Sequence, residues 1–380
     1  MTLAFITNLV NHHQLPLADE FYKRLGDSYY YISTEPMPEW LVQGGYDESL
    51  DRPYVIRTYR SNEEMAKARE IIDICDVVIM GAGPIDWVLD RKEKNRITFH
   101  YSERWLKRID YNAISLFNLQ NVYKHYWRFR NSRCYMLCAS AFTASDMKFY
   151  HIFPHKRFKW GYFTHVDDFN ISFYRNNKDN DSVKRLMWCA RFLDWKHPEL
   201  PVLLAERLKR TGYHFVIDMF GGGEMFEEIK KMVHEKGLGD YVILRGNLPN
   251  AMIIEEMRKH EIFLFTSDRY EGWGAVANEA MSNGCALVAS NKIGSVPFLV
   301  KDGENGLIFK SGSLKSMEKK VKMLLDKPEL IDSLSKTAMK TMREVWSPQQ
   351  AAISFLNLVN YIIDDRLDDY QVFEGPASWN

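Results

Sequence analysis

Short apolar runs alternate with segments of helical periodicity along almost the whole chain, and this alternation constrains the fold more than any other feature. It is typical of parallel α/β structure, because a helix must return the chain to the same edge of the sheet after each strand. A polar stretch at 175–182 divides the pattern into two series of similar length. We therefore expect an α/β fold of two Rossmann-like, doubly wound domains, with ligand sites at the carboxyl ends of the strands.

The expected strands are short and rich in β-branched and aromatic residues. In the first series they cover residues 3–7, 29–33, 76–80, 96–100 and 135–139. In the second series they cover 186–190, 214–220, 241–245, 262–266, 286–289 and 307–309. Helices are expected at 17–25, 201–210, 224–235, 251–259, 275–282 and 313–325. We expect an N-terminal domain over residues 1–172, completed by a C-terminal helix at about 350–380, and a second domain over 183–349.

Composition limits the class of protein. Lys+Arg and Asp+Glu both number 50, so no overall field favours nucleic acid. Five scattered cysteines without a Cys-x-x-Cys pair argue against a disulfide framework or a structural zinc site, and favour a reducing compartment. The first residues show no basic leader, and no apolar run approaches the roughly 20 residues of a membrane span. A cytoplasmic protein is expected.

The segment with the most chemical information is 268–284, which follows an expected strand and opens an expected helix. Gly272 and Gly274 allow backbone amides to approach a ligand closely, and free amides at the start of a helix suit a phosphate. Glu271 and Glu279 bracket this turn with seven residues between them. Taken singly, each carboxylate is more often a helix-terminal acid or a solvated residue. Their combination with Gly-x-Gly favours a ligand site in which one faces a sugar and the other accepts hydroxyl bonds.

These residues resemble a known family. The segments 271–290, 294–297 and 302–307, with 190–196, 220–224 and 244–247 upstream, resemble the donor-site core of retaining glycosyltransferases of family four. The resemblance covers roughly residues 185–346 and implies the GT-B architecture, two Rossmann-like domains facing a central cleft. Two positions depart from the family pattern: Ala190 replaces a glycine before the first arginine, and Phe298 replaces an acid that usually follows the proline.

The resemblance also implies roles for individual residues. Arg191 and Lys196 would bind the nucleotide diphosphate and neutralise the charge that grows as it leaves. Glu279 would accept hydrogen bonds from the ribose hydroxyls, and Glu271 is a catalytic candidate that holds the donor sugar. The residues expected to present backbone to the donor sugar and phosphates are Gly272, Trp273, Gly274 and Ala275. Asn247 and Leu248 would lie near the base.

Three histidines are further candidates. His100 ends an expected strand and is either a core residue or, as the resemblance implies, a catalytic residue near the donor sugar. His12 and His13 follow the first expected strand, in a loop that either contacts the acceptor or is plain surface. No third ligand at suitable spacing supports a metal site there. The same loop lacks the Gly-x-Gly-x-x-Gly turn of a dinucleotide-binding oxidoreductase. We expect neither a metal nor a cofactor, only a nucleotide-sugar co-substrate, with a UDP-sugar favoured.

The stretch 104–160 is basic and rich in aromatic residues. It carries eleven Lys and Arg against only Asp110 and Asp146. This mixture suits an anionic membrane surface or a lipid-diphosphate acceptor. The alternative is a basic face whose aromatic side chains point into the core. Nucleic acid is a poor third possibility, because the motif at 268–284 resembles a donor site for a nucleotide sugar.

Taken together, the sequence predicts a retaining, metal-independent glycosyltransferase that moves a sugar from a nucleotide-diphosphate sugar to a carbohydrate or lipid-linked acceptor, in polysaccharide or glycolipid assembly. Closure around the donor would exclude water. Peripheral contact with the inner face of the cell membrane is a further expectation. The alternatives are a non-catalytic nucleotide-sugar-binding or scaffold protein of the same architecture, a sugar-nucleotide epimerase, or a phosphorylase, which would need a pyridoxal-binding lysine that the sequence does not identify.

Overall fold

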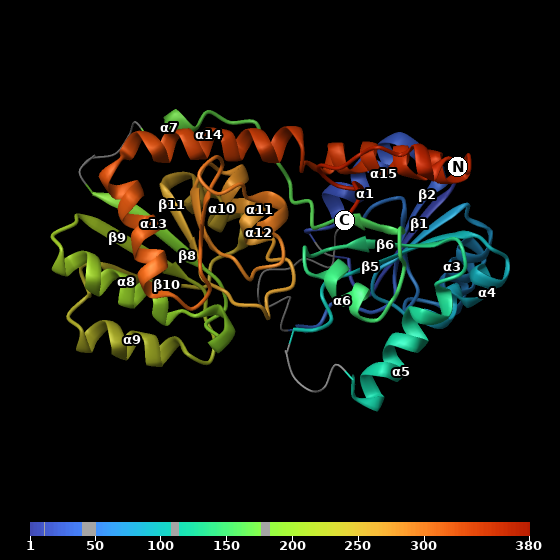
Figure 1. Cartoon of the computed structure of the whole chain (residues 1–380), viewed down its shortest axis with the longest axis horizontal. Coiled ribbons are helices and arrows are strands. Elements are labelled where there is room, and N and C mark those ends of the chain that lie inside the picture. Colours follow the sequence, from blue (N-terminus) through green and yellow to red (C-terminus); the bar gives the residue numbers. More distant parts are fainter. Residues whose placement is uncertain (11, 40–50, 108–113, 176–182) are drawn as a thin grey trace. The chain divides into compact units, whose positions relative to one another are not determined.

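The computed structural model describes the 380-residue chain except residues 11, 40–50, 108–113 and 176–182. It divides into two compact units (Figure 1): Met1–Thr164 with Ser347–Asn380, and His165–Trp346. The predicted polar linker at 175–182 falls almost wholly outside the described residues. The first boundary lies earlier than the predicted residue 172, because the segment after Thr164 is held by the second unit, where Asp167 forms an ion pair with Arg258.

The first unit is built on a parallel seven-stranded sheet in the order β3-β2-β1-β4-β5-β6-β7. Its strands are β1 (Leu3–Thr7), β2 (Tyr29–Ser33), β3 (Val55–Arg57), β4 (Val77–Met80), β5 (Ile97–Ser102), β6 (Cys134–Cys138) and β7 (Arg157–Lys159). The two edge strands, β3 and β7, were not predicted, because three residues are too few to show a period-two pattern. β5 continues to Ser102, beyond the predicted end at residue 100.

The helices of the first unit come from both ends of the chain. They are α1 (Leu15–Leu25), α3 (Asn62–Ile74), α4 (Leu89–Glu93), α5 (Leu116–His125), α6 (Thr143–Phe149) and α15 (Pro348–Ile363), with the 3-10 turns Gly26–Ser28, Ile85–Val88, Trp127–Phe129 and Leu367–Asp369. The Ser347 hydroxyl caps α15 by accepting from the Gln350 amide at 3.2 Å. In α15, the centroid of the Phe355 ring lies 5.5 Å from that of Phe21 in α1 and 4.9 Å from that of Phe99 in β5. The C-terminal helix is therefore part of the first core.

The second unit is built on a parallel six-stranded sheet in the order β10-β9-β8-β11-β12-β13. Its strands are β8 (Lys184–Cys189), β9 (Phe215–Phe220), β10 (Val242–Gly246), β11 (Ile262–Phe265), β12 (Ala286–Ser290) and β13 (Leu307–Phe309). Its helices are α7 (Ile171–Arg175), the 3-10 turn Asp194–Lys196, α8 (Glu199–Arg210), α9 (Phe226–Glu235), α10 (Asn250–Lys259), α11 (Val276–Ser282), α12 (Val296–Leu299), α13 (Leu314–Asp326) and α14 (Pro328–Glu344). The strand order reverses between β8 and β11, which is where such sheets bind ligands.

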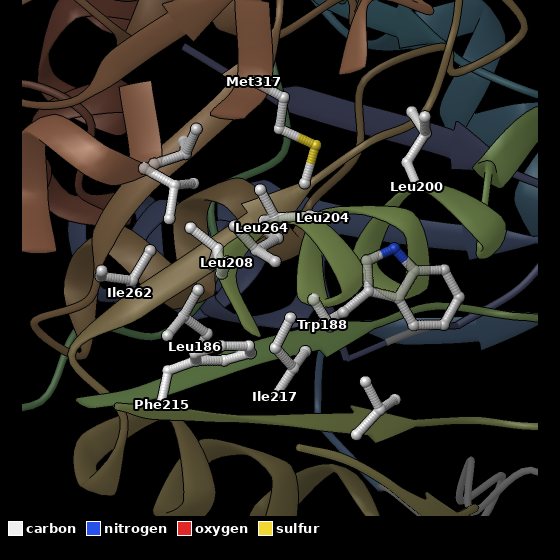
Figure 2. Packing of buried hydrophobic residues seen from close by; sticks show 14 of the residues in the cluster. Leu186, Trp188, Leu200, Leu204, Leu208, Phe215, Ile217, Ile262, Leu264 and Met317 are labelled. Carbon is white, nitrogen blue, oxygen red and sulfur yellow. The ribbon is translucent and has the colours of Figure 1, made fainter. Parts of the chain in front are cut away.

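The core of the second unit fixes these strands. Figure 2 shows Leu186 and Trp188 of β8 packed with Leu204 and Leu208 of α8 and Met317 of α13. All five side chains have at most 1% of their surface exposed. Such close packing leaves the strand ends little freedom to move, so the loops that follow them start from fixed positions. Among the described residues, no helix combines the length and the apolar character that crossing a membrane requires.

Candidate functional site

Two loops meet at the switch point of the second sheet, one after β8 (190–198) and one after β11 (266–275). Lys196 forms an ion pair with Glu271, and the two side chains are only 13% and 10% exposed. The hydroxyl of Thr266 donates to the carbonyl oxygen of Lys196 at 2.6 Å, and the amide of Asp268 donates to the carbonyl of Trp195 at 3.0 Å. The structure thus brings two of the predicted site residues together and joins their loops by hydrogen bonds to backbone carbonyls.

The glycine turn after β11 has a steric cause. Gly274 has φ +81°, and a Cβ there would lie 2.4 Å from Cζ of Phe265 and 3.1 Å from Cγ of Glu271, so only glycine fits. The side chain of Trp273 is fully buried and donates from Nε1 to Oδ1 of Asn278 at 2.8 Å. Ala275 precedes the first residue of α11. The backbone of the predicted stretch from Gly272 to Ala275 is therefore set firmly at the start of a helix.

Glu279 is the fourth residue of α11 and has 7% of its surface exposed. One carboxylate oxygen accepts from Nδ2 of Asn250 at 3.1 Å. Burial raises the pKa of Glu279 to about 7, while the hydrogen bond from Asn250 opposes this shift. Glu279 therefore changes charge close to neutral pH. Asn250 was missed in the sequence, although a polar residue opening a helix just after a strand is a usable signal.

The loops after β8, β9 and β10 are bonded to one another. Gly221 donates its amide to the carbonyl of Gly246 at 2.8 Å, and Phe192 donates to the carbonyl of Gly222 at 2.9 Å. A Cβ on Gly221, at φ +123°, would lie 2.0 Å from the carbonyl oxygen of Ala190. The close approach that a glycine before Arg191 would allow is thus provided from the neighbouring loop.

Other predicted donor-site residues lie at the same strand ends. Arg191 is exposed in the loop after β8, Asn247 is exposed, and Leu248 is half-buried after β10. The ring of Phe298, which stands where the family usually has an acid, stacks on Trp346 with centroids 6.0 Å apart. That position therefore contributes to aromatic packing and offers no carboxylate to a sugar.

His100 lies inside β5 and not at its end, which corrects the expectation that placed it at a strand terminus. It is 3% exposed, and its ring centroid lies 4.9 Å from Phe129, 5.5 Å from Tyr126 and 5.8 Å from Phe153. Burial lowers its pKa to about 3, with a smaller contribution from His125. An imidazole that stays neutral among aromatic rings fits the core interpretation, and the catalytic role of His100 stays a prediction.

His12 and His13 lie in the loop between β1 and α1 and are both half-buried. Their ring centroids are 3.9 Å apart, and His13 lies 6.3 Å from the ring of Tyr162. Residue 11, just before them, lies outside the described residues. The pair follows the carboxyl end of the central strand β1, where doubly wound sheets bind ligands, and its role in acceptor contact stays a prediction.

The basic, aromatic stretch at 104–160 separates into two kinds of residue. Many of its members serve the core: Arg104 pairs with Asp146 at 3.3 Å, and Trp105 stacks on Tyr126 at 3.9 Å. Others face solvent on and beside α5, which has no buried residue. The large apolar side chains exposed there are Ile114 (67%), Leu116 (73%), Phe117 (71%), Leu119 (44%), Tyr123 (56%) and Trp127 (37%). Arg108, Asp110 and Tyr111 lie outside the described residues.

Solved structures show which class of protein this fold defines. The chain matches Anabaena HepE in complex with UDP with a TM-score of 0.69 at 13% identity, covering 96% of this chain and 100% of HepE. It matches the lipopolysaccharide outer core galactosyltransferase WaaB with a TM-score of 0.69 at 15% identity, covering 95% and 100%. At such identities the likeness concerns the fold alone. The fold is that of the GT-B glycosyltransferases, with two Rossmann-like domains, and the predicted fold class is confirmed.

The likeness in sequence lies in the second unit. Residues 171–341 match the model of the glycosyl transferases, group 1, and the predicted resemblance to glycosyltransferases is confirmed. Poly(glycerol-phosphate) alpha-glucosyltransferase of Bacillus subtilis is 30% identical over 152 residues, 40% of this chain and 22% of that protein. Alpha-D-kanosaminyltransferase of Streptomyces kanamyceticus is 28% identical over 40% of this chain and 39% of that protein. The matched region thus spans well under half the length of either relative.

Proposed function

We propose that the chain transfers a sugar from a nucleotide-diphosphate sugar to an acceptor hydroxyl. The observation that carries this proposal is the Lys196–Glu271 pair at the switch point of the second sheet, within the residues that match the glycosyltransferase family. A cation held there by a buried carboxylate has a fixed position from which to neutralise a leaving diphosphate. Arg191, exposed on the same loop, supplies a second positive charge with a planar fork for phosphate oxygens.

The proposed chemistry retains the anomeric configuration. The bond between the sugar C1 and the phosphate oxygen breaks, and the acceptor oxygen forms its bond to C1 on the same face. The departing phosphate oxygen takes the acceptor proton, so no protein base is required. Both curated relatives named above are alpha-transferases, which supports retention from an alpha-linked donor. Lys196, Arg191 and the backbone amides near Gly274 supply the positive field, so we propose a reaction that uses neither a divalent metal nor a cofactor.

We further propose a UDP-sugar donor and an acceptor that is a carbohydrate or a lipid-linked sugar, in polysaccharide or glycolipid assembly. HepE has been solved with UDP and with UDP-glucose, and the name of one relative specifies a polymer acceptor. All five cysteines are free thiols, which suits a cytoplasmic site of action.

A thermal-shift panel of UDP-, GDP- and ADP-sugars tests the donor site. We expect one nucleotide family to stabilise the protein, and Glu279→Ala and Arg191→Ala to weaken that stabilisation. Release of nucleoside diphosphate only when acceptor is present would then favour transfer over a non-catalytic binding protein or an epimerase. If no nucleotide sugar stabilises the wild type, the proposed donor site is wrong.

We also propose that α5 rests peripherally on an anionic membrane. Leu116 and Phe117 are among the most exposed apolar side chains of the described residues. Residues 114–145 contain no Asp or Glu, and their basic residues are Lys124, Arg128, Arg130 and Arg133. Apolar side chains beside uncompensated positive charge suit the headgroup region of an anionic leaflet.

Vesicle sedimentation tests this contact. We expect the protein to bind vesicles of phosphatidylcholine with phosphatidylglycerol and to bind phosphatidylcholine alone weakly. Leu116→Ser with Phe117→Ser should reduce binding on the order of tenfold. The control is Phe173→Ser, because that side chain is 69% exposed but belongs to the second unit. Equal losses in the two variants would contradict a role specific to α5.

A further inference from the structure

His197 stands in a backbone conformation that L-residues seldom adopt. It directly follows Lys196 and has φ 52° and ψ 56°, the left-handed region. For a residue other than glycine this conformation costs about 1–2 kcal/mol. A residue kept there needs compensating contacts from its surroundings, and such positions concentrate at functional sites. The position next to Lys196 therefore points to a role connected with the donor loops.

The contacts of the His197 imidazole are with two carboxylates. Its Nδ1 lies 2.9 Å from Oε1 of Glu199, and its Nε2 lies 3.5 Å from Oδ2 of Asp268. An ionised carboxylate only accepts hydrogen bonds, so the arrangement is satisfied when both ring nitrogens carry a proton. All three side chains are about a quarter exposed (24%, 27% and 24%) and are therefore partly shielded from water.

The two carboxylates belong to different elements, so His197 can link these elements. Glu199 is the first residue of α8, which follows the β8 loop. Asp268 lies in the loop after β11, three residues before Glu271, and accepts from the amide of Tyr270 at 2.8 Å. The contact of His197 with Asp268 therefore joins the same two loops that the Lys196–Glu271 pair joins.

We propose that protonated His197 is a positioning residue that holds the loop of Lys196 against the loop of Glu271, and so raises the affinity for the diphosphate of the donor. The inference rests on the proposed function and deepens it, because it assigns pH control to the same site. His197 acts through Lys196 and Glu271 and is not assigned a contact with the donor itself.

Electrostatics agree with the geometry. The hydrogen bond to Glu199 raises the pKa of His197, its burial opposes this, and the charges of Glu199, Asp268 and Asp194 add to the increase. Lys196, on the same turn, is the nearest basic residue in sequence. Because the pKa is raised, the clamp is complete below about 6.5, the ordinary histidine value, and is lost as the pH rises through the higher value in the folded protein.

Isothermal titration calorimetry with UDP-glucose at several pH values between about 6 and 8 tests the proposal. Neither the diphosphate diester nor the uracil ring of UDP-glucose changes charge in this range, so the titrating groups are those of the protein. We expect wild-type affinity to fall by about fivefold towards high pH, the size of a partly exposed ion pair. His197→Gly should keep its fold, because glycine accepts this φ. At low pH this variant should bind UDP-glucose as weakly as the wild type does at high pH. Its affinity should no longer fall as the pH rises through the range in which His197 titrates in the wild type.

Two further variants sharpen the result. Asp268→Asn should remove the same pH dependence as His197→Gly, whereas His234→Asn, at an exposed position of α9, should behave as the wild type. If His197→Gly retains wild-type affinity and the wild-type pH profile, the positioning role is wrong while the donor site stands. If the wild type binds none of UDP-, GDP- and ADP-sugars at any pH, the proposed function fails and this inference fails with it.

Discussion

The two units share one plan, a parallel sheet with helices on both faces, but they place their polar groups differently. In the second unit, charged pairs such as Lys196–Glu271 join loops at the carboxyl ends of the central strands. In the first unit, a neutral imidazole, His100, is packed inside the sheet among aromatic rings, and α5 turns apolar side chains to solvent. The comparison shows that one plan accommodates both a charged pair between two loops and an uncharged imidazole within a strand.

Lys196→Ala is expected to have the largest effect, and it tests whether the ion pair of the second unit acts in sugar transfer. We expect the transfer rate at saturating donor to fall by about 10²–10³, because the diphosphate loses a preorganised cation and Glu271 is left buried without one partner. Lys231→Ala, in an exposed pair on α9, is the control and should leave the rate unchanged. If the transfer rate of Lys196→Ala is within about threefold of the wild-type rate, the loss is smaller than a preorganised charge should cause. The ion pair would then have only a structural role.

Gly274→Ala tests, through the free energy of unfolding, how tightly the turn after β11 is packed. Positive φ and a Cβ 2.4 Å from Phe265 act together at this position. We expect a loss of about 2–4 kcal/mol in the free energy of unfolding, measured with urea. Gly212→Ala is the matched control, because Gly212 also has positive φ (+78°) but nothing lies within 4 Å of its Cβ. Equal losses in the two variants would show that the donor turn is not sterically tight.

Glu279→Gln tests whether the buried carboxylate of the second unit titrates near neutrality. The pKa of Glu279 is raised from 4.5 to about 7, so its contribution favours the folded state at low pH and is lost as the pH rises from 4.5 through 7. We expect Glu279→Gln to remove up to about 3 kcal/mol of this decline in stability. The check is the difference between the two proteins in urea midpoint from about pH 5 to 8. Parallel pH profiles would contradict the raised pKa.

The smallest effect is expected in the first unit. His100 has a buried Nε2 with no hydrogen-bond partner among the described residues. His100→Met should therefore change unfolding free energy by less than about 1.5 kcal/mol and leave the transfer rate within about threefold. Initial-rate assays and urea unfolding of the same preparation check both values. The loss of a catalytic group typically lowers the rate about 10²-fold or more. Such a loss in His100→Met, with stability intact, would support the catalytic role of His100 and contradict its interpretation as a core residue.

Strand positions could be predicted in both units, since β1, β2 and β13 have their predicted bounds. In the second unit, Lys196 and Glu271 were predicted as donor-site residues, but the ion pair between them was not. The sequence indicates that such residues lie at the carboxyl ends of parallel strands, but not which strand ends are neighbours. The Lys196–Glu271 and His197–Asp268 contacts both depend on β8 lying beside β11, so neither contact was predictable. For the stretch 104–160 the sequence left two interpretations open, a surface that meets a membrane and aromatic side chains in the core, because aromatic residues suit both.

The return of α15 to the first sheet has a consequence for the order of synthesis. The second unit is one continuous segment, so all of its residues are synthesised before α15. The first unit must wait for Phe355, which packs on Phe21 and Phe99, although both of those residues were made long before. Domains commonly fold in the order of translation, but here the half that starts the chain is the last to close its core.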